Sequence, residues 1–129
     1  MQLVAADTHA ALWFLENDHR LSQPALKALD EARQILLPTI CLVEITYLVE
    51  KRRLDAAVMP RILAELDNPA TTMTLADLDL GVVRALQNIA RIDVPDMPDR
   101  VIAATALFHG VPLVTRDAKI RSCGIATIW

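Results

Sequence analysis

Residues 3–7 read LVAAD, a short apolar run that ends in an acid. Apolar runs of this length are typical of strands buried in a parallel sheet. The pattern returns at residues 112–117, PLVTRD, and a related run, ILLP, occupies residues 35–38. Longer segments with helical spacing separate these runs, and such alternation favours a parallel sheet covered by helices. The sequence therefore predicts an α/β fold, a parallel-sheet α/β/α sandwich, and 129 residues suit one domain over residues 1–129.

The expected elements alternate along the whole chain. Strands are expected at residues 3–6, 35–38, 71–75, 111–115 and 126–129. Helices are expected at residues 8–16, 23–33, 39–52, 55–66, 77–92 and 98–109, with a brief turn or helix at residues 118–121. Ser22 and Thr39 carry side chains suited to helix N-caps, and Gly110 suits the end of the helix before it.

Four acids, far apart in the sequence, lie at or just beyond the ends of apolar runs. Asp7 and Asp117 follow a strand directly. Glu44 lies one helical turn beyond residues 35–38, and Asp99 opens the helix before the last strand pair. The carboxyl ends of parallel strands point to one edge of the sheet, where ligands bind, so the four side chains should converge. Carboxylates packed together stay ionised only when a cation neutralises them. The simplest such cation is Mg²⁺ or Mn²⁺ held by oxygen ligands, which points to metal-dependent phosphodiester chemistry.

Composition narrows the class of protein. Hydrophobic residues make up 53% of the chain and the mean hydropathy is +0.32. The longest apolar run, residues 10–15, is nevertheless far shorter than the roughly 18 residues of a membrane-spanning helix. Residues 1–7 contain no basic segment of the kind that begins a secretory signal, so we expect a cytoplasmic protein. A homodimer or a permanent protein partner explains the surplus of apolar residues better than a membrane does.

Cysteine content and charge exclude further classes of site. Cys41 and Cys123 are the only cysteines; without a secretory signal they should be free and mostly buried, and no CxxC motif offers a zinc site. The net charge of −3 argues weakly against a protein that coats nucleic acid, but not against a nuclease whose acids bind metal. Arg100 and Arg116 flank the acids, so they are candidates for phosphate contact, with structural ion pairing as the alternative.

Four motifs, taken in their order along the chain, resemble those of one family. They are DTHAALW at residues 7–13, the helix that carries Glu44, DRVIAATA at residues 99–106, and LVTRD at residues 113–117. Each motif alone is weakly specific. As an ordered set that spans essentially the whole chain, they resemble the PIN-domain ribonucleases, and most of all the VapC toxins of bacterial type II toxin–antitoxin pairs.

The resemblance implies a PIN-like domain and assigns its site residues. It matches four residues of this chain with acids that hold one or two Mg²⁺ or Mn²⁺ ions: Asp7, Glu44, Asp99 and Asp117. Thr115 matches a hydroxyl residue that supports the site. The implied activity is that of an endoribonuclease, a hydrolase that cuts phosphodiester bonds in single-stranded or loop RNA. The implied partner is a small cognate antitoxin whose C-terminal segment blocks the acidic groove.

Plainer explanations exist for several of these acids. Asp7 and Asp99 suit helix N-termini without any catalytic role, and Asp117 suits a turn. Asp93 and Asp96 compete with Asp99 as metal ligands, and Asp96 is a candidate auxiliary acid.

Packing roles are expected for His9 and for the remaining aromatic residues. A packing or hydrogen-bonding role is expected for His9. Core or dimer contacts, rather than base stacking, are expected for Trp13, Phe14, Tyr47 and Trp129.

Two rival functions remain open. One rival function is that of a non-catalytic PIN-like module that binds protein. The other is a phosphotransferase with Asp7 as nucleophile, which would resemble a DxD motif, although position 9 is histidine.

Overall fold

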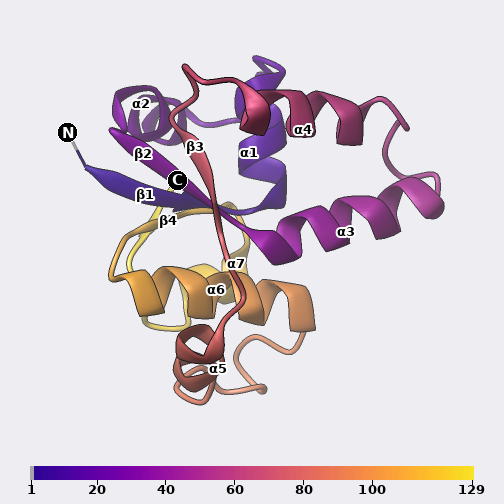
Figure 1. The fold of residues 1–129 in the computed structure, drawn as a ribbon. Coiled ribbons are helices and arrows are strands. Elements are labelled where there is room, and N and C mark those ends of the chain that lie inside the picture. Colours follow the sequence, from indigo (N-terminus) through magenta and orange to yellow (C-terminus); the bar gives the residue numbers. More distant parts are fainter. Residues whose placement is uncertain (1) are drawn as a thin grey trace.

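Five parallel strands form the sheet at the centre of the computed structural model, which describes residues 2–129 (Figure 1). Met1, the first residue of the expected domain, lies outside the described residues. The strands are β1 (Leu3–Ala6), β2 (Gln34–Pro38), β3 (Met73–Ala76), β4 (Leu113–Val114) and β5 (Thr127–Ile128). Their order across the sheet is β3-β2-β1-β4-β5. The chain proceeds outward from β1 in both directions, so the crevice that favours ligand binding lies between the carboxyl ends of β1 and β4.

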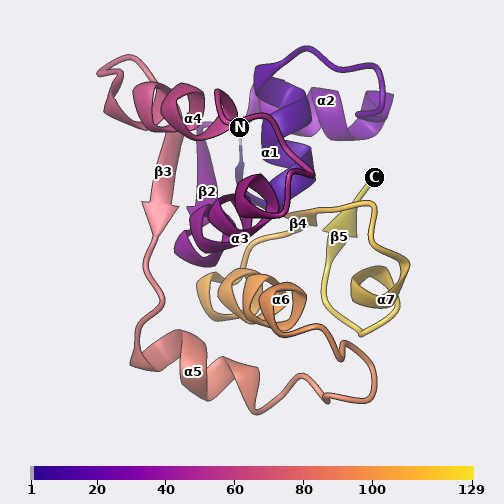
Figure 2. The same ribbon diagram turned by 90° about the vertical axis from the view of Figure 1, so that its right-hand side faces the viewer.

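Helices cover both faces of the sheet (Figure 2). Their bounds are α1 (Thr8–Leu15), α2 (Gln23–Glu31), α3 (Thr39–Glu50), α4 (Val58–Asp67), α5 (Leu80–Leu86), α6 (Met97–His109) and α7 (Ala118–Arg121). α1, α2 and α4 lie on one face, and α5, α6 and α7 lie on the other. α3 contacts both α1 and α6 because it leaves the sheet at the carboxyl edge. The α/β sandwich predicted from the sequence is confirmed.

The sheet and α6 supply much of the buried core. Val4, Ile35 and Leu113 are fully buried, as expected for strands covered on both faces. α6 adds an unbroken buried stretch, residues 101–106, which includes three alanines. Small side chains let a helix pack closely against its neighbours, and α6 contacts β1 and α3. This packing fixes the first turn of α6 relative to the end of β1.

The expected long helix at residues 77–92 is wrong in its extent. Its helical part, α5, is limited to Leu80–Leu86, with Asp79 as the N-cap. Beyond Leu86 the backbone tightens into turns, with the amide of Ile89 donating to the carbonyl of Leu86. The guanidinium of Arg100 on α6 donates to the carbonyls of Leu86 and Ile89. These carbonyls are satisfied from α6, so the helix does not need to continue.

Other helix starts also differ from the sequence-based boundaries. Thr39 was expected to cap α3, but Pro38 is the N-cap residue and the Thr39 hydroxyl donates to the carbonyl of Ala76 at the end of β3. Asp55 shapes a turn by accepting from the amide of Ala57, so α4 begins only at Val58. α6 begins at Met97, one residue before the start predicted at Pro98.

The state of both cysteines agrees with the sequence-based expectation. Cys41 is buried and Cys123 half-buried, and both are free. Within residues 2–129, no helix combines the length and the apolar character needed to cross a bilayer.

Candidate active site

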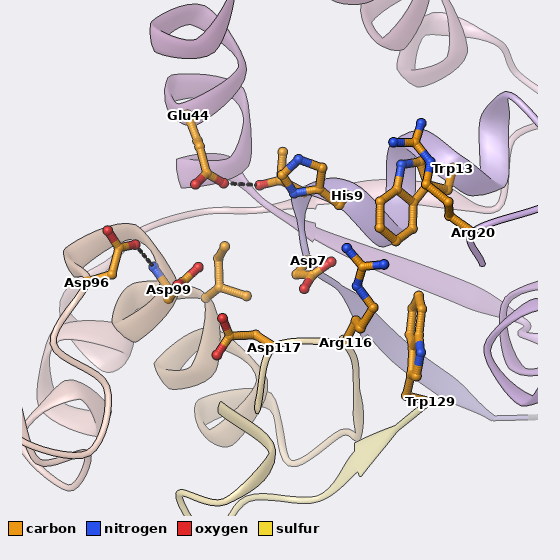
Figure 3. A pocket seen from close by; sticks show the side chains of 12 residues that line it. Asp7, His9, Trp13, Arg20, Glu44, Asp96, Asp99, Arg116, Asp117 and Trp129 are labelled. Carbon is orange, nitrogen blue, oxygen red and sulfur yellow. Dashed lines mark hydrogen bonds between the residues drawn. The ribbon is translucent and has the colours of Figure 1, made fainter. Parts of the chain in front are cut away.

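The predicted convergence of acids is present at the carboxyl edge of the sheet. A cavity of about 440 Å³ opens there beside the ends of β1 and β4. Five acids line it: Asp7, Glu44, Asp96, Asp99 and Asp117. Figure 3 shows their side chains pointing toward a common space. They come from four places in the chain, because Asp96 and Asp99 both lie at the start of α6, and the fold brings these four places together.

Asp7 is held at both carboxylate oxygens. As the N-cap of α1, it accepts a hydrogen bond at Oδ1 from the amide of Ala10, 2.9 Å away. At Oδ2 it accepts from the hydroxyl of Thr115, 2.5 Å away. Burial raises the pKa of Asp7, while these two hydrogen bonds and the nearby His9 oppose the rise. The two hydrogen bonds therefore fix the orientation of the carboxylate, while burial disfavours its charged form. Each oxygen keeps a lone pair for a cation.

Thr115 connects the acids at the ends of two adjacent strands. Its hydroxyl donates to Asp7 and accepts from the amide of Asp117, 3.1 Å away. Asp117 is in turn the N-cap of α7 and accepts from the amide of Ile120 at 2.9 Å. The structure thus places Thr115 between two of the acids it was expected to support.

Glu44, Asp96 and Asp99 form the tightest group of acids. One carboxylate oxygen from each lies within 4.8 Å of the other two. Glu44 projects from α3 and accepts at Oε1 from the Thr8 hydroxyl at 2.5 Å. Asp96 is the N-cap of α6 and accepts from the amide of Asp99 at 3.2 Å. Asp96, considered only an auxiliary acid from the sequence, is therefore brought into the same group, whereas Asp93 does not line the cavity.

The negative charge of the neighbouring acids affects the pKa of Asp99. Burial raises the pKa of Asp99 to about 7, and the carboxylates of Asp96, Asp117 and Glu44 add to the rise. A carboxyl that takes up a proton near neutral pH marks a site that favours a positive charge.

The donor set fits a hard divalent cation. Every donor is a carboxylate oxygen, which is the ligand type that Mg²⁺ and Mn²⁺ prefer. The Cys41 thiol lies near these acids, but burial and the surrounding negative charge raise its pKa, so it offers no thiolate to a softer metal. The residues that can hold the ion are Asp7, Glu44, Asp99 and Asp117, with Asp96 as a fifth.

The opposite wall of the cavity is basic and aromatic. Trp13, Arg20, Arg116 and Trp129 line it, together with the exposed His9 (Figure 3). Trp13 is a core residue, as expected, yet one side of it borders the cavity.

Arg100, the other arginine expected near phosphate, lies elsewhere. Its Nε donates to the carbonyl of Ile89 at 2.8 Å and its Nη2 to that of Leu86 at 3.2 Å. It does not line the cavity. Arg100 therefore anchors the segment after α5 to α6, and its expected phosphate contact does not agree with this position.

Sequence reasoning missed two residues of the site. Thr8 is buried and orients Glu44, but no local pattern indicates a partner 36 positions away. Arg20 belongs to a loop between two helices, and only the fold places it against the cavity. The direct adjacency of Thr8 to Asp7 is the one signal that points to it.

Comparisons with known proteins agree with this geometry. Residues 4–125 match the family model described as PIN domain. The chain is 30% identical over 122 residues to Ribonuclease VapC22 of Mycobacterium tuberculosis, an alignment that covers 95% of this chain and 92% of that protein.

Solved structures show the same fold at lower identity. A toxin–antitoxin complex from Klebsiella pneumoniae contains a chain with a TM-score of 0.70 at 20% identity, covering 98% of this chain and 96% of that chain. The VapBC2 complex of Rickettsia felis, bound to a promoter DNA fragment, gives a TM-score of 0.69 at 14% identity, with 98% and 97% covered. With its sheet, its acidic edge and these relatives, the chain belongs to the PIN-domain family.

Proposed function

We propose that this protein is a metal-dependent endoribonuclease that acts as the toxin of a toxin–antitoxin pair. The observation that carries the proposal is the convergence of five acids, three of them with oxygens within 4.8 Å of one another. The relationship to a VapC ribonuclease over most of both chains supports RNA as the substrate.

The residues of this chain have distinct roles in the proposed hydrolysis. Asp7, Asp99 and Asp117 would hold Mg²⁺ or Mn²⁺, with Glu44 and Asp96 as further ligands. The chemistry that such an ion supplies is a bound water of lowered pKa and polarised phosphoryl oxygens. Glu44, which accepts a hydrogen bond from Thr8, would align the attacking water or accept its proton. The hydrogen bonds to Asp7 keep that carboxylate in one orientation, so little reorganisation accompanies the reaction.

Protein partners belong to the same proposal. Solved structures with this fold include toxin–antitoxin complexes, and we infer a small cognate antitoxin for this chain. Large apolar side chains are exposed on several helices and loops, including Val43, Tyr47, Leu80, Ile92 and Phe108. Exposed apolar surface of this kind suits a protein interface, in keeping with an antitoxin, a homodimer, or both, in the cytoplasm.

The test is cleavage of total cellular RNA by the purified protein. Mn²⁺ or Mg²⁺ should produce discrete new 5′-phosphate ends, and EDTA should abolish them. Asp99→Asn should remove the activity, while Asp67→Asn, the same charge change at an exposed residue at the end of α4, should leave it intact. Equal cleavage by both variants would overturn the assigned site.

If the RNA stays intact, a measurement of metal binding distinguishes the two remaining alternatives. Mn²⁺ binding without cleavage would direct attention to the phosphotransferase alternative. Intact RNA without metal binding would favour a non-catalytic binding module.

A further inference from the structure

The two walls of the cavity carry opposite charge. The acids that would hold metal gather on one side, and Trp13, Arg20 and Arg116 face them from the other (Figure 3). A phosphodiester substrate has the same division, because the reacting phosphate needs cations while its neighbours along the strand need separate positive partners. With the reacting phosphate at the acids, the basic wall would face the next phosphates of the nucleic-acid strand.

Trp13 supports both arginines of this wall. The indole is only 5% exposed, and it is anchored on α1, which Asp7 caps. The guanidinium carbon of Arg116 lies over its ring at 4.7 Å from the centroid, and that of Arg20 at 4.9 Å. Contact with an aromatic face holds a guanidinium in place without using its N–H groups, which stay available for an anion.

Arg20 and Arg116 differ in what neutralises them. Arg20 is paired with Asp18, which accepts from its Nε at 3.1 Å and from its Nη2 at 2.7 Å. Within residues 2–129, by contrast, no carboxylate lies within ion-pair distance of Arg116, although it shares the cavity with five acids. Arg116 is therefore an oriented guanidinium whose N–H groups have no acidic partner among the described residues.

We propose that Arg116, seated on Trp13, binds the backbone phosphate adjacent to the reacting one. Arg116 is thus a positioning residue of a nucleotide subsite. This inference rests on the proposed ribonuclease function for its substrate class, a single strand of RNA. Trp13 holds the guanidinium of Arg116 beside the acids, and Arg20, paired with Asp18, packs against the same indole. A guanidinium binds phosphate through two parallel N–H groups, which fixes the strand as well as attracting it.

The test compares two arginines that lie five positions apart. Arg116→Gln removes the proposed contact, and Arg121→Gln makes the same charge change on α7 outside the cavity. Both are made in the Asp99→Asn background, so that RNA stays intact. The probe is a fluorescein-labelled decamer of uridylate, and its affinity is measured with Mn²⁺ over a range of salt concentrations.

Arg116→Gln should weaken binding of the decamer about tenfold, and it should reduce the slope of log affinity against log salt by about 0.7, the value for one phosphate of a single strand. Arg121→Gln should leave both unchanged. Arg116→Lys keeps the charge without the planar fork and should recover part of the affinity. In the protein with Asp99 restored, Arg116→Gln should raise KM and leave kcat unchanged.

The outcomes separate this subsite from the proposed function. Equal affinity and equal salt slope for Arg116→Gln and Arg121→Gln would overturn the subsite while leaving the ribonuclease proposal standing. So would the absence of any binding by the parent Asp99→Asn protein when the unsubstituted protein cleaves RNA. A selective loss in Arg116→Gln establishes the subsite even if the unsubstituted protein cuts no RNA.

Discussion

Replacing Thr115 with valine removes one hydroxyl at nearly constant volume. Thr115 is fully buried, and its Oγ1 donates to Asp7 Oδ2 at 2.5 Å and accepts from the amide of Asp117 at 3.1 Å. Valine fits the same space but can make neither bond. The substitution therefore isolates the contribution of this hydroxyl to stability and to the order of the site.

The two lost interactions set the expected size of the effect. A hydrogen bond to a charged group contributes about 1.5–3 kcal/mol, and an amide left unpaired costs about 1–3 kcal/mol. The valine no longer buries a hydroxyl, which offsets part of this loss. We expect a net loss of about 2–3 kcal/mol in the free energy of unfolding, or about 10 °C in Tm for a chain of this length. Because the hydroxyl also orients Asp7, the affinity for Mn²⁺ should fall about 10-fold to 100-fold.

The assay is urea unfolding of the metal-free protein together with calorimetric titration of Mn²⁺. Thr105→Val is the matched control, since Thr105 is also buried but its hydroxyl donates only to the carbonyl of Val101 within α6. Thr105→Val should change stability by less than about 1 kcal/mol and leave Mn²⁺ binding intact. Thr115→Ser, which keeps the hydroxyl, should bind Mn²⁺ normally. If the two valine variants behaved alike in both measurements, the reasoning about Thr115 would be refuted.

Three other perturbations test separate features of the structure. The pKa of Asp99 is raised to about 7 in the folded protein, so the folded protein binds a proton there more tightly than the unfolded chain does. The Tm of the metal-free protein should therefore rise as the pH falls from about 8 to about 6. Asp99→Asn should flatten that rise. Over the same range Mn²⁺ affinity, measured by calorimetry, should fall because protons and metal compete. Arg100→Met should speed amide exchange around Leu86 and Ile89 with unchanged kcat for RNA cleavage, since Arg100 satisfies their carbonyls rather than the substrate. Gly110→Ala should cost about 1–2 kcal/mol in urea unfolding, because Gly110 ends α6 at a φ of +65°.

Local signals in the sequence were sufficient to predict the α/β architecture. The apolar runs became β1, β2 and β4 because a strand buried on both faces needs no alternation. Gly110 ended α6 as predicted, since the left-handed conformation at that position favours glycine. The convergence of acids followed from the fold class alone, because parallel strands present their carboxyl ends at one edge.

The features that the sequence did not predict depend on partners distant along the chain. α5 stops at Leu86 because Arg100, 14 positions later, takes up its carbonyl. Thr39 faces the carbonyl of Ala76 on another strand instead of capping its own helix. The pairing of Thr8 with Glu44 spans 36 positions. Each side chain had a plausible local use, and tertiary packing selected a different one.

Capping a helix and holding a metal are compatible uses of the same acid. Asp7, Asp96 and Asp117 are the N-caps of α1, α6 and α7, and each accepts a backbone amide with one carboxylate oxygen. The bond fixes the carboxylate while leaving lone pairs free, and the partial positive charge of the donor amides reduces the repulsion among the acids. A sequence in which an aspartate follows a strand and begins a helix therefore satisfies both roles at once. The acids can gather before any cation arrives because the helix ends that they cap already supply part of the compensating charge.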